Sequence, residues 1–246
     1  MIAGVCLILC FGCGNQSGPS SAAEAATTGS DLTSGITDLK PSTYQLALDK
    51  SLESTPIDRL CKESKGYNQN EWEGKNACGW AIEKFRIEQN SKLVERKEGN
   101  LVLNLESGSM EIDHPTDAGN PISSYYQFKG YVKGPNAFII LTQKKDSCPQ
   151  YWLIDRKDGR KTILNGLPVF NAQQDAFVLS QASQQASTCN NDLEYWVLKN
   201  GQFVKSWSAK PDQDVYDMVW AKGKTWYGLV KSEGQKVVSS VQINPG

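Results

Sequence analysis

The sequence has one histidine, His114, and few of the motifs that mark a catalytic site. A Ser-His-Asp or Cys-His mechanism would have to use this imidazole, and no Gly-x-Ser-x-Gly motif accompanies it. The 26 basic and 27 acidic residues are interspersed, so the chain has no basic patch for nucleic acid or anionic lipid. No Gly-rich phosphate loop or cofactor motif is present. These absences argue against a nucleic-acid partner, a bound cofactor and a bound metal ion. They favour a role without catalysis.

Long hydrophobic runs are also missing. The apolar start of the chain, residues 1–13, is shorter than the roughly 20 residues that cross a bilayer, and its length is typical of a signal peptide. Residues 9–13 (LCFGC) resemble the lipobox of bacterial lipoproteins, in which a small residue precedes the cysteine that is lipidated. The resemblance implies a signal peptide over 1–13, a lipid on Cys13 and attachment to the cell envelope. Gly14, in place of the aspartate linked to inner-membrane retention, implies the outer membrane, with the protein facing the periplasm or the cell surface.

Residues 14–40 contain almost no large apolar side chains and are rich in Gly, Ser, Ala and Thr. Such a composition cannot bury enough surface to offset the loss of backbone entropy on folding. We therefore expect a flexible linker over 14–40. The remaining residues, 41–246, are enough for a single globular domain.

Four cysteines lie in this domain: Cys61, Cys78, Cys148 and Cys189. An even number in an exported protein predicts two disulfides. Three pairings are possible, and we favour Cys61 with Cys78 and Cys148 with Cys189, because each joins neighbours along the chain. A zinc site is the alternative, but no pair has Cys-x-x-Cys spacing and the chain has a single histidine.

The periodicity of apolar residues divides the domain into two parts. Residues 41–90 have helical spacing, with helices expected at 41–52, after Thr55-Pro56, and from 76 to about 88. From residue 91 to 246 the period changes to two and turn residues recur at short intervals. The fold class is therefore α+β, mainly β, with a short helical part followed by antiparallel hairpins.

A weak repeat runs through the β part. The segment that starts at Tyr151-Trp152 resembles the one that starts at Tyr195-Trp196, and a looser third copy starts at Trp226. The spacing of the first two copies is typical of a propeller blade, and residues 167–179 resemble the inter-blade turn of periplasmic β-propeller proteins. The chain after residue 91 is short for four full blades, so a propeller-like arrangement and a sandwich both stay open.

Tryptophans offer the best candidates for a binding surface, because flat aromatic faces stack on sugars and anchor protein interfaces. Most strand tryptophans are expected in the core, whereas Trp72 and Trp207 are the two that we expect to be exposed. Three carboxylates between Pro211 and Asp217 could hold calcium, although a solvated loop is the simpler interpretation.

The sequence thus favours a lipid-anchored protein of the bacterial cell envelope that binds a protein or glycan partner without catalysis, such as an inhibitor or immunity protein or an accessory subunit of an envelope assembly. The alternative is an envelope hydrolase that acts on glycan or peptide through paired carboxylates or His114. A structural module of a surface layer is a third hypothesis.

Overall fold

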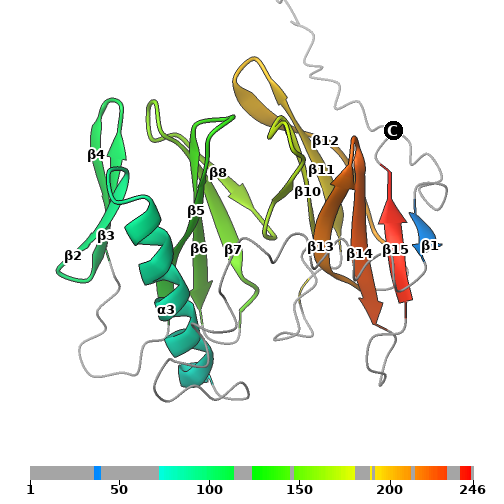
Figure 1. Cartoon of the computed structure of the whole chain (residues 1–246), viewed down its shortest axis with the longest axis horizontal. Helices are drawn as coiled ribbons and strands as arrows, with labels where there is room; N and C mark the ends of the chain where they lie inside the picture. The colour runs from blue at the N-terminus through cyan, green and yellow to red at the C-terminus, as the bar shows by residue number, and fades with distance from the viewer. Residues whose placement is uncertain are drawn as a thin grey trace, which may run out of the picture. The chain divides into compact units, whose positions relative to one another are not determined.

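The structure, a computed structural model, describes residues 36–39, 72–113, 124–144, 147–180, 189, 192–211, 214–231 and 239–244. All of them belong to the compact unit that runs from Leu32 to Gly246. In these ranges the chain forms one α-helix and fifteen β-strands, which make four antiparallel sheets (Figure 1). The expected fold class, α+β and mainly β, is confirmed.

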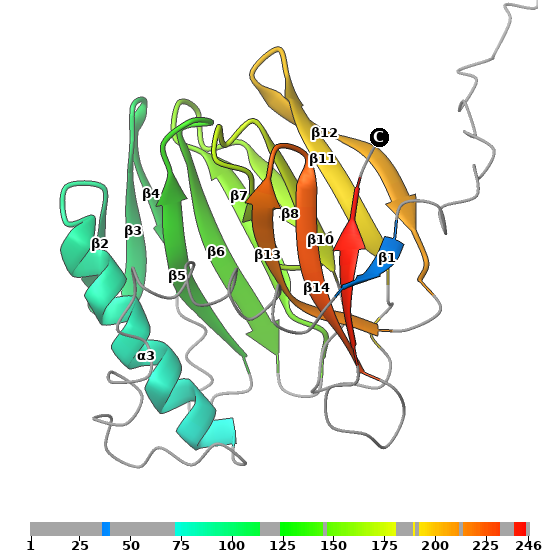
Figure 2. The same ribbon diagram turned by 45° about the vertical axis from the view of Figure 1, so that its right-hand side comes forward.

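Apart from β1, which comes first in the chain and pairs in the last sheet, the four sheets follow one another along the chain (Figure 2). The first sheet contains β2 (Val94–Lys97), β3 (Asn100–Leu105) and β4 (Gly108–Ile112). The second contains β5 (Ser124–Val132), β6 (Ala137–Lys144), β7 (Gln150–Asp155) and β8 (Lys161–Leu164). The third contains β9 (Val169–Phe170), β10 (Ala176–Ser180), β11 (Leu193–Lys199) and β12 (Gln202–Ala209). The fourth contains β13 (Asp214–Lys222), β14 (Thr225–Lys231), β15 (Ser239–Ile243) and β1 (Ile36–Leu39).

The helix, α3 (Trp72–Gln89), covers the helix expected at 76–88 and packs against β5. It ends in a turn in which the side-chain amide of Asn90 donates to the carbonyl of Arg86 (2.8 Å). The two other expected helices lie outside the described residues.

Tight turns set the register of the hairpins. Glu98 and Gly99 between β2 and β3 both have positive φ (52° and 90°), as do Asn200 and Gly201 between β11 and β12 (51° and 76°). Two consecutive residues with positive φ form the type I′ turn, whose twist matches that of the strands it joins. The Gly-containing turns expected from the sequence are therefore present.

Strand β6 shows why the sheets stack. Its residues alternate between two clusters of buried side chains: Phe138 and Ile140 pack toward the first sheet, whereas Ala137 and Ile139 pack toward the third. A strand buried on both faces needs an unbroken apolar run, and residues 137–141 (AFIIL) supply one.

The third sheet is buried on both faces in the same way. Phe177 of β10 packs toward the second sheet, and Val178 packs toward Trp226 of the fourth. Consecutive sheets therefore pack face to face, as consecutive propeller blades do. Among the described residues no core cluster joins the first sheet to the fourth, so the arrangement is a stack of sheets rather than a closed ring.

The sequence repeat agrees with this stack in two of its three copies. Tyr151 and Tyr195 lie in β7 and β11, each the third strand along the chain of a four-stranded sheet. The third copy is not equivalent, because Trp226 lies in β14, which in the spatial order β13-β14-β15-β1 is the second strand of the fourth sheet, whereas β7 and β11 are third when counted from β5 and β9. An aromatic pair followed by aliphatic residues suits any β-strand, which explains the false match.

Strand β1 changes the expected limits of the linker. Residues 36–39 lie within the range 14–40, yet they pair antiparallel with β15, from Ile36 opposite Ile243 to Leu39 opposite Ser240. The strand is only four residues long and its partner β15 lies far along the chain, so the local composition gave no sign of the pairing. Residues 36–39 therefore belong to the fourth sheet and not to the expected linker, and the rest of the range 14–40 lies outside the described residues.

Candidate functional site

The favoured pairing of Cys148 with Cys189 is confirmed: the two form a disulfide with a Cα–Cα distance of 5.6 Å. It connects the segment before β7 to the segment before β11, and so joins the second and third sheets. Cys78 in α3 is also disulfide-bonded. Its expected partner Cys61 lies outside the described residues, as do Cys13 and His114.

The two tryptophans expected at a binding surface lie far apart in the chain. Trp207 of β12 is half-buried and packs against Tyr195, with ring centroids 6.2 Å apart. Trp72 is the first residue of α3. The acidic loop at 211–217 lies partly outside the described residues, and the described part of the chain contains no group of metal-binding side chains.

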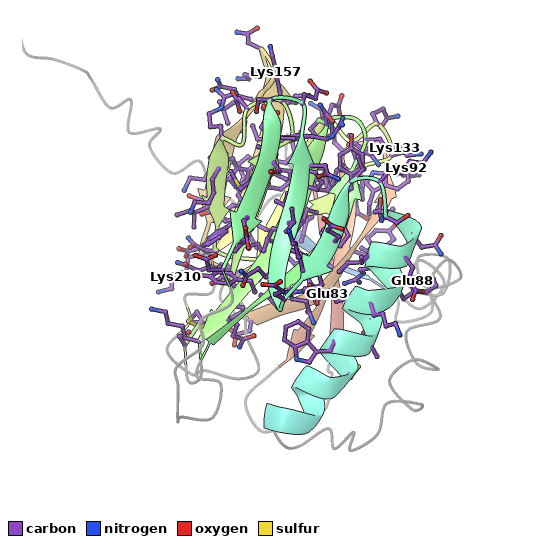
Figure 3. The ribbon with its side chains drawn as sticks, turned by 90° about the vertical axis from the view of Figure 1, so that its left-hand side faces the viewer. Glu83, Glu88, Lys92, Lys133, Lys157 and Lys210 are labelled. Atoms are coloured by element: carbon purple, nitrogen blue, oxygen red, sulfur yellow. A yellow bond between two sulfur atoms is a disulfide. The ribbon has the colours of Figure 1, made fainter. Side chains whose placement is uncertain are left out.

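A buried ion pair closes one edge of the second sheet. Glu83 of α3 is 2% exposed and lies between the helix and the strands (Figure 3). Its carboxylate accepts from Arg96 of β2 at both oxygens (2.7 and 3.3 Å) and from the backbone N–H of Phe128 (2.6 Å). The same guanidinium donates to the carbonyl of Tyr126 (2.6 Å) and lies over the ring of Trp80.

The side chains of Glu83 and Arg96 take the place of a neighbouring strand beside β5. Phe128 and Tyr126 belong to β5, the edge strand of the second sheet, and an unpaired edge can recruit other chains. Glu83 supplies an acceptor and Arg96 a donor, as a paired strand would. Burial raises the pKa of the Glu83 carboxyl above its ordinary value, although Arg96 and the Phe128 amide act in the opposite direction.

Two further cations lie beside this pair. Arg86 follows Glu83 by one helical turn, and its guanidinium nitrogen Nη1 is buried without a hydrogen-bond partner. Lys129 of β5 donates to the side-chain oxygen of Gln127 (3.1 Å). Burial, with the charge of Arg86 as a smaller cause, lowers the pKa of Lys129 to about 8. Burial also lowers the pKa of Arg86.

The opposite edge of the second sheet, β8, is open. The Asp155 amide donates to the Arg160 carbonyl (2.9 Å), and hydrogen-bonded pairs alternate along an antiparallel ladder. The register of β7 with β8 therefore turns the N–H and C=O groups of Lys161 and Ile163 away from β7. Within the described ranges these groups have no backbone partner.

Strand β12 is an edge strand of the third sheet, and it too has backbone groups that face away from its own sheet. The N–H of Leu198 donates to the Asp175 carbonyl, away from β12. Its partner in the register, Phe203, therefore also has backbone groups that face away from the sheet. The next residue, Val204, is 38% exposed, and Ile163 of β8 is 53% exposed.

Between these two edges lies a cleft of about 110 Å³. Its apolar lining comes from both sheets and includes Leu153 and Phe203, and its polar lining includes Asp155, Arg160 and Lys161. Ligand pockets typically measure about 300–1,000 Å³. The cleft is therefore large enough for one side chain of a partner but too small for a cofactor.

The hairpin from β7 to β8 places positive charge beside the cleft. Arg160 is paired with Asp155 (3.3 Å) and Asp158 (3.6 Å). In the described part of the chain neither Lys157 nor Lys161 has a carboxylate partner, and Lys161 lies over the ring of Trp152 (3.8 Å). Figure 3 shows Lys157 at the end of the strands.

The sequence contains only a weak signal of this site. Residues 155–161 contain four basic and two acidic side chains, which marks a basic hairpin. Which strand lies at an edge, however, depends on the pairing of the whole sheet, and no local pattern reveals it.

Comparison of the chain with protein-family models, with curated proteins and with solved structures finds no match. The function must therefore be argued from the geometry. Among the described residues no helix is long and apolar enough to be a transmembrane span.

Proposed function

We propose that the protein is a non-catalytic binding protein of the bacterial cell envelope, anchored by a lipid on Cys13, that captures a protein partner along the outer edge of β8. The observation that carries the proposal is the open edge at Lys161 and Ile163 beside a cleft that fits one side chain. Unpaired backbone groups at a sheet edge are completed by an extended peptide, which adds a strand.

A protein fits this edge better than a glycan. The outward N–H and C=O groups of β8 alternate with the spacing of another β-strand, which a sugar chain does not reproduce. The exposed side chain of Ile163 adds an apolar contact on one face of β8, and the cleft on the opposite face would take an anchoring side chain.

The charge of the hairpin indicates the kind of segment. Lys157 and Lys161 have no carboxylate partner in the described ranges, so an extended segment with acidic side chains would complement them. Complementary charge of this type mainly raises the association rate and fixes the register. The proposed occupant is therefore an acidic, extended segment of another envelope protein.

An Ile163→Pro variant tests the proposal on the full-length protein. Proline removes the outward N–H at 163, whereas the ladder between β7 and β8 does not use that group. Short peptides that alternate acidic and apolar residues should shift the NMR amide signals of Lys161 and its neighbours in the wild type. The shifts should be lost in Ile163→Pro and kept in the matched variant Ile163→Val. Equal responses to acidic peptides and to basic peptides of the same pattern would contradict the proposal.

The same experiment separates a second copy of the chain from a different partner. If the wild type dimerises through β8, size-exclusion chromatography should show a dimer that Ile163→Pro abolishes, and the acidic segment would then be the wrong occupant. The anchor has its own test: labelled palmitate should be incorporated by the wild type but not by Cys13→Ser.

A further inference from the structure

Turns from all four sheets lie at one end of the fold, as Figure 1 and Figure 2 both show. The amide of Glu106, after β3, donates to the carbonyl of Arg156, after β7, and the amide of Arg156 donates to the carbonyl of Asn136, after β5. The amide of Gly134 donates to the side-chain oxygen of Gln174 (2.7 Å), which lies between β9 and β10. We call this surface the turn face, and we define it as the turns with one residue on either side: 89–94, 105–108, 132–137, 155–161, 170–176, 199–202 and 222–225.

The turn face is strongly basic. It contains nine basic and four acidic side chains, a net charge of +5, whereas the whole chain has a net charge of −1. In the described part of the chain its two arginines pair with carboxylates, but none of its lysines does. All seven lysines are exposed: Lys92, Lys133, Lys157, Lys161, Lys199, Lys222 and Lys224. Basic and acidic residues are interspersed along the sequence, so no basic patch was expected, and the fold corrects that expectation by bringing these lysines together.

The described part of the N-terminal region joins the domain at the same end. Ile36, the first residue of β1, pairs with Ile243, and Ile243 pairs with Trp226 of β14. The next residue of β14 toward the turn, Thr225, pairs with Lys222 on the turn face. The segment that leads from Cys13 to the domain therefore enters it beside the turn face.

We propose that the turn face lies on the anionic lipid headgroups of the membrane to which the protein is anchored. The proposal takes the anchor at Cys13 from the proposed function, and it adds which end of the domain faces that membrane. Lysine side chains extend their ammonium groups to a phosphate surface while the turns stay in water. Each lysine near an anionic surface is expected to strengthen binding about fivefold.

Vesicle binding by the full-length Cys13→Ser variant tests the turn face without the anchor. Vesicles of phosphatidylcholine alone give the baseline, because the apolar residues 1–13 are present in every sample. Vesicles that also contain about 30 mol% phosphatidylglycerol should bind the protein about tenfold more tightly or better at roughly 0.05 M salt. The difference should disappear at about 0.5 M salt, because salt screens exposed charges. Cosedimentation measures both affinities.

Three lysines outside the hairpin from β7 to β8 are the ones to change, so that the edge of β8 stays intact. In the same Cys13→Ser background, Lys133→Gln, Lys199→Gln and Lys222→Gln combined should weaken binding to the anionic vesicles about tenfold or more. Arginine at the same three positions keeps the charge and should bind like the parent protein. All three side chains are exposed, so little change in stability is expected.

The matched control removes the same amount of charge from the other end of the strands. Lys97 ends β2, Lys144 ends β6 and Lys210 follows β12, and all three are exposed. Figure 3 shows Lys210 away from Lys133. Lys97→Gln, Lys144→Gln and Lys210→Gln combined should leave binding to the anionic vesicles unchanged.

Two results would overturn the proposal: equal binding to the two kinds of vesicle, or an equal loss in the two triple glutamine variants. The second would mean that only the total charge of the protein matters. Neither result bears on the anchor, which the incorporation of palmitate tests separately. A wild type that incorporates no palmitate would remove the anchor, while the vesicle experiment would still decide whether the turn face binds anionic lipid.

Discussion

Strands β5 and β8 are the two edges of one sheet, and they differ in whether their outward backbone groups are hydrogen-bonded. On β5 the pair of Glu83 and Arg96 occupies the outward backbone groups. On β8 the equivalent groups of Lys161 and Ile163 have no partner in the described ranges. Since proteins generally protect sheet edges, an edge that is closed by buried side chains serves stability, and an open one is available for binding.

We expect the closed edge to depend on hydrogen bonding more than on charge. Because burial raises the pKa of Glu83, the fold penalises its charged form. The stabilising contribution linked to this shift is full below the ordinary pKa and is lost as the pH rises through the raised value. The essential contribution of Glu83 is then to accept from Arg96 and from the Phe128 amide.

The largest expected effect is on this closed edge. Glu83→Ala should lower the free energy of unfolding by about 3–4 kcal/mol, because it leaves the Arg96 guanidinium and the Phe128 amide without their acceptor. Glu83→Gln should cost clearly less, since it keeps an acceptor oxygen. Urea unfolding measures both, and Glu88→Gln, an exposed change on the same helix, is the control. An equal loss in the Gln and Ala variants would show that charge dominates.

Two proline substitutions in β8 test, within a single strand, which backbone N–H groups pair with β7 and which face away from it. The N–H of Thr162 faces β7, so Thr162→Pro should cost about 2–3 kcal/mol through the lost ladder bond and strain. The N–H of Ile163 faces away, so Ile163→Pro should cost roughly 1 kcal/mol or less. Unfolding midpoints of the two variants check the difference. A reversed order would mean that the register of β8 is wrong.

Lys129 provides a smaller effect with a characteristic pH dependence. Burial lowers its pKa to about 8 on folding, with the charge of Arg86 as a smaller cause and the charge of Glu83 acting in the opposite direction. The contribution of such a group is full above its unfolded pKa and is lost as the pH falls through 8. Lys129→Met should therefore stabilise the protein by about 1–2 kcal/mol below pH 8, after a discount for partial exposure. The gain should shrink between pH 8 and about 10.5, as measured by urea unfolding at several pH values across that range. A gain independent of pH would indicate improved packing instead.

Local patterns were enough to predict much of the fold. Alternation and Gly-containing turns predicted the antiparallel hairpins, and apolar spacing predicted α3 over 76–88. The order of the cysteines along the chain predicted the bond from Cys148 to Cys189. Each of these features depends on residues that are close in sequence or on a rule of chain connectivity, so a single sequence contains the information.

The candidate sites depend on long-range pairing and could not be predicted. Glu83 and Phe128 are separated by 45 residues, and nothing near Glu83 in the sequence indicates that it closes a strand edge. The sequence around Lys129 is likewise that of an ordinary exposed strand residue, and only the packing of α3 against β5 explains its burial. Trp207 was predicted at a binding surface because of its aromatic chemistry, yet it packs against Tyr195. The open edge consists instead of backbone groups, which have no sequence signature.

The smallest expected effect on stability tests whether β8 serves binding alone. Ile163 is 53% exposed, so Ile163→Thr should change the free energy of unfolding by no more than about 0.5 kcal/mol. Threonine keeps the backbone N–H and the β-branched shape, but it loses apolar area that a docked segment would cover. Acidic extended peptides should therefore bind this variant more weakly than the wild type while the two unfold at the same urea concentration. If Ile163→Thr instead destabilised the protein as Glu83→Ala is expected to, both edges would be structural, and the distinction between β5 and β8 would fail.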